Sequence, residues 1–206
     1  MDSNGRLRIL YTANLRGRID LLPRLHTFIR RLREGSDGPR TLLLDLGRSC
    51  DDAAWHCAAT QGRSMLIALD AMGFDAANVS GQLDPAGHQR LQDNFLNLGL
   101  VDETHSWDGG GVMAALSEGS IESAALSILL RPFPMTRVEG RRLNLAEILG
   151  GQVGDATLQI NHERVTLVES VNHDLPSTAL PDPTITAAVD FILSEARRFQ
   201  HRQSDT

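Results

Sequence analysis

The segment from residue 50 to residue 57 gathers side chains that bind metals or take part in redox chemistry. Cys50, His56 and Cys57 stand there beside two carboxylates, Asp51 and Asp52. Thiolates and imidazoles are ligands of transition metals, and a pair of thiols can be oxidised and reduced. The spacing matches no metal-binding signature, so a metal site and a redox-active thiol pair are alternatives to ordinary packing. Two cysteines so close together suggest no disulfide framework, and we expect reduced thiols.

Two arginines, Arg16 and Arg48, each follow a short apolar run, residues 7–13 and 41–46, that predicts a buried strand. In parallel sheets, ligands lie outside the carboxyl ends of the strands. A guanidinium suits bidentate phosphate binding, so Arg16 and Arg48 together could hold an anion. The alternative is that each arginine forms a stabilising salt bridge with a nearby carboxylate: Asp45, Asp51 or Asp84.

The elements around these residues predict an α/β fold. Apolar residues at helical spacing in residues 22–32 lie between the two strands, and residues 61–72 predict a helix before a third strand at 75–79. Alternating strands and helices indicate a parallel sheet with right-handed crossovers. The later chain predicts the following elements: a helix at 86–99, a glycine-rich loop at 107–120, a strand at 124–130, an antiparallel hairpin at 156–161 and 164–171, and a helix at 184–199.

Several phrases of the sequence resemble the calcineurin-like metallophosphoesterases, in their 5'-nucleotidase and UDP-sugar hydrolase branch. They are ILYTANLRGRIDLLPRLHTFIRRLRE, TLLLDLGRS and GRSMLIALDAMGFDAANVSG, and later AEILGGQVGDATLQINHERVTLV and LPDPTITAAVDFI. The resemblance implies a reduced, metallophosphoesterase-like α/β sandwich, with a mainly parallel sheet core and a C-terminal antiparallel hairpin and helix. We expect residues 1–200 to form this single domain and residues 201–206 to be a disordered tail.

The same resemblance implies that the catalytic motifs have degenerated. The family binds two divalent metals with the motifs D-x-H-G-R, G-D and G-N-H-[DE] after three strands. Here Asn14 and Arg16 replace the first Asp and His, and Arg48 replaces the Asp of G-D. Gly81 and Gln82 stand at the Asn and His of the third motif.

A shift of one residue in the third motif would match Gly81 to its glycine and Asp84 to its acid, but Leu83 would then stand at the histidine. The family's remaining ligands are histidines in motifs such as G-H-x-H, and residues 106–161 contain none. Each close contact between like charges costs about 4 kcal/mol at an effective dielectric constant of about 20, so two arginines in the former metal site oppose a dication. The sequence therefore predicts no two-metal catalysis and assigns no catalytic residue and no cofactor.

Composition limits the remaining functions. The chain has 206 residues, a net charge of -6 and only 4% aromatic residues, which argues against nucleic-acid binding. It shows no membrane span and no signal peptide, so we expect a cytoplasmic protein. The leading hypothesis is a pseudoenzyme that acts as an interaction module or accessory subunit, with another protein or complex as its partner. The alternatives are an enzyme of altered chemistry, either a divergent hydrolase or a thiol or metal redox enzyme, and a sensor of phosphate or a nucleotide.

Overall fold

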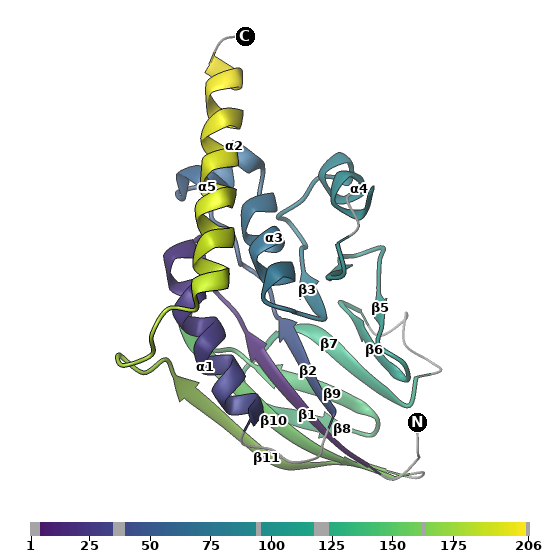
Figure 1. The fold of residues 1–206 in the computed structure, drawn as a ribbon. Coiled ribbons are helices and arrows are strands. Elements are labelled where there is room, and N and C mark those ends of the chain that lie inside the picture. The colour runs from purple at the N-terminus through teal and green to yellow at the C-terminus, as the bar shows by residue number, and fades with distance from the viewer. Residues whose placement is uncertain (1–4, 35–39, 94–95, 118–123, 162–163, 205–206) are drawn as a thin grey trace.

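Two β-sheets pack face to face, and helices cover the outer face of the larger sheet (Figure 1). This computed structural model describes residues 5–34, 40–93, 96–117, 124–161 and 164–204. The described helices are η1 (Ile19–Leu21), α1 (Leu22–Glu34), α2 (Trp55–Thr60), α3 (Arg63–Ala71), α4 (Pro85–Asp93) and α5 (Pro183–Ser204). None of them is both long and apolar enough to cross a membrane.

The larger sheet has the strand order β11-β10-β1-β2-β3-β4. Its strands are β1 (Gly5–Thr12), β2 (Arg40–Asp45), β3 (Ala76–Asn78), β4 (Gly99–Val101), β10 (Gln152–Ile160) and β11 (Val165–Asp174). Strands β1 to β4 are parallel, and β10 and β11 form the antiparallel hairpin that the sequence predicts. The α/β fold class is thus confirmed, with the loops after β1, β2, β3 and β4 at one edge of the sheet.

Successive side chains of β1 and β2 enter two different cores. Leu10 and Leu43 pack against the helices, whereas Ile9, Tyr11 and Leu44 pack against the second sheet. Because side chains alternate between the faces of a strand, a strand buried on both faces is apolar throughout. This explains the continuous apolar runs from which both strands could be predicted.

The second sheet was not predicted as a separate layer. Its order is β5-β6-β7-β9-β8, formed by β5 (Trp107–Asp108), β6 (Val112–Ala115), β7 (Leu126–Phe133), β9 (Arg142–Ala146) and β8 (Arg137–Glu139). The loop predicted at 107–120 is therefore wrong where it meets β5 and β6, and residues 118–120 lie outside the described part of the chain. The glycines at 109–111 form the tight connection between β5 and β6, and Val112 and Ala114 are fully buried.

Two predicted helices and the predicted tail also need correction. Gln61 and Gly62 have φ angles of 51° and 81°, and this break separates α2 from α3, so no helix begins at residue 61. The helix predicted at 86–99 ends at Asp93, and its last residue begins β4. At the C-terminus, α5 continues to Ser204, so residues 201–204 are helical rather than disordered; residues 205–206 lie outside the described ranges.

Candidate functional site

Backbone hydrogen bonds join the loops after β1 and β2. The amide nitrogens of Asn14, Arg16 and Gly17 donate to the carbonyl oxygens of Gly47, Arg48 and Ser49 over 3.0, 2.9 and 2.7 Å. Arg16 and Arg48 therefore lie on adjacent loops at the carboxyl edge of the sheet, and both side chains are exposed. Neither guanidinium makes an ion pair or a hydrogen bond with any residue that the structure describes. The salt bridges considered as an alternative are absent from this part of the chain.

These two loops hold unusual backbone conformations. The φ angles of Asn14, Arg16 and Arg48 are 55°, 49° and 56°, a region that residues other than glycine enter at a cost of about 1 kcal/mol or more. The side chain of Asn14 fixes the first loop from outside by donating to the carbonyl oxygen of Ile148 over 2.9 Å. Such strain tends to gather at functional sites, and here it includes Arg16 and Arg48, for which the sequence analysis considers anion binding as one of two alternatives.

The nearby carboxylates take neutral donors. Asp45 is fully buried and accepts hydrogen bonds from the Thr12 hydroxyl at 2.7 Å and from the Gly47 amide at 2.9 Å. Burial raises the pKa of Asp45 to about 7, although the two hydrogen bonds act in the opposite direction. Asp84 accepts a hydrogen bond of 2.6 Å from the Gly87 amide in the first turn of α4. Both carboxylates thus serve the scaffold.

The loop after β3 makes polar contacts at the positions of the degenerate third motif. The Oε1 atom of Gln82 accepts a hydrogen bond of 2.8 Å from the Ser49 hydroxyl, and its Nε2 donates to the carbonyl oxygen of Gly62 over 3.0 Å. Gly81 has a φ of 69° and turns the chain. Gln82 therefore ties the loop after β3 to the loop after β2 and to the break between α2 and α3.

Cys50 and Cys57 form a disulfide, so the expectation of reduced thiols is wrong. The first turns of α2 bring Cys57 back toward the loop that carries Cys50, and the two Cα atoms lie 5.7 Å apart, a normal separation for a disulfide. His56, next to Cys57, is buried between the loop after β1 and α3. Its Nδ1 lies 2.8 Å from the Ser64 hydroxyl, and its Nε2 lies 2.8 Å from the carbonyl oxygen of Gly17. Both sulfurs are therefore held in the disulfide. Reversible reduction of this pair, the redox alternative, stays a prediction.

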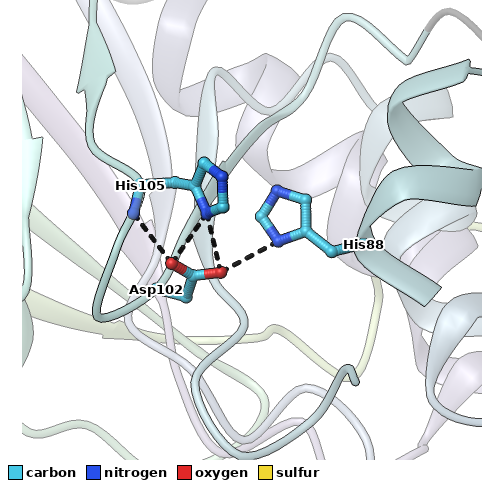
Figure 2. Close-up of side chains that lie close together, drawn as sticks. All are labelled: His88, Asp102 and His105. Carbon is cyan, nitrogen blue, oxygen red and sulfur yellow. Dashed lines mark hydrogen bonds and ion pairs between the residues drawn. The ribbon is translucent and has the colours of Figure 1, made fainter. Parts of the chain in front are cut away.

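A second group of side chains, which the sequence analysis missed, lies further along the same sheet edge. Asp102 follows β4, His105 lies in the turn before β5, and His88 points toward them from α4 (Figure 2). The Nδ1 atoms of His88 and His105 each lie 2.9 Å from an oxygen of Asp102. The two imidazole ring centres are 4.3 Å apart. Within the described ranges, this is the one group of three or more His, Cys, Asp or Glu side chains that could hold a metal ion.

Asp102 is held as a carboxylate. Partial burial acts to raise its pKa, but hydrogen bonds from Thr104 and His105 outweigh that effect and hold the pKa well below the usual range. The donors are the backbone amide and hydroxyl of Thr104, at 2.7 and 2.9 Å, and the amide of His105, at 2.8 Å. The group borders a pocket of about 420 Å³ that Ser80, Asp84 and Gln92 also line. A negative charge therefore faces two imidazoles at a solvent-accessible pocket.

One signal in the sequence could have found this group. With β4 predicted at its observed place, Asp102 would have been the first residue after a parallel strand, where ligands are expected. The helix predicted through residue 99 concealed that strand. Nothing in the spacing of His88 and Asp102 points to their contact, since it depends on how α4 packs over the loop.

No protein-family model matches the sequence, and the search of curated proteins finds no match. Among solved structures, the chain is similar to the calcineurin-like phosphoesterase YfkN from Bacillus subtilis, with a TM-score of 0.62 and 11% sequence identity. The match covers 95% of this chain and 99% of that one. The fold is thus that of a calcineurin-like phosphoesterase, as the sequence resemblance implied, and the 5'-nucleotidase branch stays a prediction.

Proposed function

We propose that this chain is a non-catalytic protein built on the phosphoesterase fold. The observation that carries the proposal is the chemistry of the loops after β1, β2 and β3. They present the guanidiniums of Arg16 and Arg48, while Gln82 is used in hydrogen bonds between loops. In the part of the chain that the structure describes, no group of metal-ligating side chains gathers at these three loops. A site with this charge repels a dication.

As a function for such a scaffold, we propose an interaction module or accessory subunit of a larger assembly. The support comes from α5 and the helices beside it. Phe191 is 66% exposed on α5, and Trp55 on α2 and Ile67 on α3 are each 39% exposed. Figure 1 shows α5 rising past α2, beyond both sheets. These side chains lie on three helices that pack against one another, and exposed apolar side chains that cluster are typical of protein-binding surfaces.

A second candidate function is binding of phosphate or a nucleotide without turnover. The observation that favours it is the pair of exposed guanidiniums on adjacent loops, held by backbone in the left-handed region. A bidentate guanidinium would bind the phosphate oxygens that metals bind in the enzymes this chain resembles. A ligand of this kind stabilises the folded state by RT ln(1 + c/Kd), where c is its free concentration, so the melting temperature should rise with phosphate or nucleotide concentration, and Arg48→Asp should abolish that gain.

The activity assay tests the main proposal directly. The chain is incubated with Mn²⁺, Mg²⁺ or Zn²⁺ and with a phosphomonoester, a phosphodiester and a 5'-nucleotide, and phosphate release is measured. We expect the rate to equal that of the unfolded chain. Turnover that a chelator removes would contradict the proposal. Turnover that survives the chelator but disappears in a Cys50→Ser, Cys57→Ser double variant shown by circular dichroism to be folded would also contradict it, in favour of an enzyme of altered chemistry.

A photo-crosslinking amino acid tests the interaction module. Placed at Phe191, it should give one discrete cross-linked product in extracts of the source cells, and placed at exposed Arg137 on β8, away from α5, it should give none. Equal patterns from both positions would contradict an interface on α5. Fractionation of the source cells tests the expected cytoplasmic location, because a disulfide is more typical of oxidising environments.

A further inference from the structure

His88 is the unusual member of the group at the end of β4. It is only 4% exposed, yet its Nδ1 has no hydrogen-bond partner among the described residues. Oδ2 of Asp102 lies 2.9 Å away, within ion-pair distance but outside hydrogen-bond geometry. A buried polar atom without a hydrogen bond costs about 1–3 kcal/mol, so such an atom calls for a ligand.

We propose that His88, Asp102 and His105 bind one divalent transition-metal ion, with at least one coordination position open to the adjacent pocket. Two imidazoles and a carboxylate are a ligand set of zinc and ferrous sites, and an open position is a feature of sites that bind a further ligand. This inference is independent of the proposed function, because it concerns metal binding at β4 and not hydrolysis at the loops after β1 and β2.

The distances fit a shared ion. Ligand atoms at about 2.1 Å from one metal stand roughly 3 Å from one another when they are at right angles. Each Nδ1 atom lies 2.9 Å from an Asp102 oxygen, and one ligand atom from each of the three residues lies within 4.8 Å of the others. Figure 2 shows both rings turning Nδ1 toward the carboxylate. An ion held by the three groups would give Nδ1 of His88 the directed bond that its contact with Asp102 does not supply.

The surroundings of the group suit a cation. Hydrogen bonds to Oδ1 from the Thr104 amide and hydroxyl and from the His105 amide fix the orientation of the Asp102 carboxylate. The far nitrogen of His88, Nε2, lies 3.0 Å from Nε2 of Gln92. With the Gln92 amide in the opposite orientation, Oε1 accepts the Nε2–H of His88, which leaves the Nδ1 lone pair for the metal. His105 is half exposed, and the pocket of about 420 Å³ gives an ion a path from solvent.

A titration without a histidine tag tests this site. The chain is stripped with a chelator and titrated with Co²⁺ or Zn²⁺ alone, while calorimetry measures stoichiometry and visible absorption reports the cobalt ligand field. We expect one ion per chain. Asp102→Asn and His105→Ala should each weaken binding at least about tenfold and change the cobalt spectrum. The matched controls Asp190→Asn and His201→Ala, both exposed on α5, should bind as the unmodified chain does.

Asp102 also orders the turn around Thr104, so Asp102→Asn could unfold it. His105→Ala then decides the matter, because this side chain is half exposed and its loss leaves no large cavity. Absence of saturable binding, or equal affinity in His105→Ala and His201→Ala, would overturn the proposal and leave the group as an ion-paired cluster. The phosphoesterase assay is measured separately, so failure of one proposal is distinguishable from failure of the other.

Discussion

Asp45 makes the stability of this protein depend on pH in a way that one substitution can isolate. Its carboxyl group is fully buried, and burial raises its pKa from 3.8 to about 7. In the folded state the group therefore keeps its proton over a range in which the unfolded chain has lost it. Because the folded state binds more protons, stability is greatest at acidic pH within that range and falls as the pH rises toward the folded pKa.

The size of this effect follows from the two pKa values. One pKa unit is worth about 1.4 kcal/mol, so the free energy of unfolding should fall by about 2 kcal/mol between about pH 5 and pH 7 through this group alone. Asp45→Asn removes the titration but keeps the shape: the Asn amide donates to the Thr12 hydroxyl, and its oxygen accepts from the Gly47 amide. Below about pH 4 the two proteins should be nearly equal in stability, and the variant should become increasingly the more stable as the pH rises from there toward 7.

Urea denaturation followed by tryptophan fluorescence, repeated across this pH range, measures the difference between the two proteins. Other titrating groups affect both proteins and cancel in that difference. Asp52→Asn, at an exposed position, is the control and should give a difference that does not change with pH. A constant difference for Asp45→Asn as well, or one that favours the unmodified chain as the pH rises, would refute the assignment of a raised pKa to Asp45.

Three further experiments test the loops around the site. Replacing Cys50 and Cys57 with serine should lower the free energy of unfolding by about 2–3 kcal/mol, because the disulfide closes a short loop; equal urea midpoints with and without reductant would contradict this. Gly17→Ala should cost about 2 kcal/mol in a thermal melt, since φ is 75° and the added Cβ would meet Cβ of Ala54 at 2.4 Å. Arg48→Gly should raise stability by up to about 1 kcal/mol by relieving its positive φ, whereas Arg6→Gly on β1 should lower it.

The elements that could be predicted are those with strong local patterns. The runs at 7–13 and 41–46 are apolar throughout because both faces of β1 and β2 are buried, and the alternating pattern at 156–171 predicted the hairpin of β10 and β11. The short strands β5 and β6 were not predicted, because they flank three consecutive glycines that are typical of a loop. Val112–Ala115 is buried as β6 because β7 lies beside it, a contact that the local sequence does not show.

The candidate site likewise has features that could be predicted from the sequence and features that could not. That Arg16 and Arg48 lie on adjacent loops followed from the strand order, because the carboxyl ends of parallel strands share an edge. The Cys50–Cys57 disulfide could not be predicted in this way. It forms because the short helix α2 turns Cys57 back toward Cys50, and the spacing of the two cysteines does not reveal that turn. The contact of His88 with Asp102 joins a helix to the end of an unpredicted strand, and no spacing rule covers such a pair.

The loops after β1, β2 and β3 are held together by the chain itself. Backbone hydrogen bonds join the first two loops, Gln82 joins the third to the second, and His56 fixes Gly17 beside the disulfide. In an enzyme of two-metal type, ligands from several loops share ions, and the ions contribute to order in those loops. Here that order needs no ion, so a chelator should leave the stability contributed by these loops unchanged. Any stability that depends on a metal ion should instead be confined to α4 and the turn that carries Asp102 and His105.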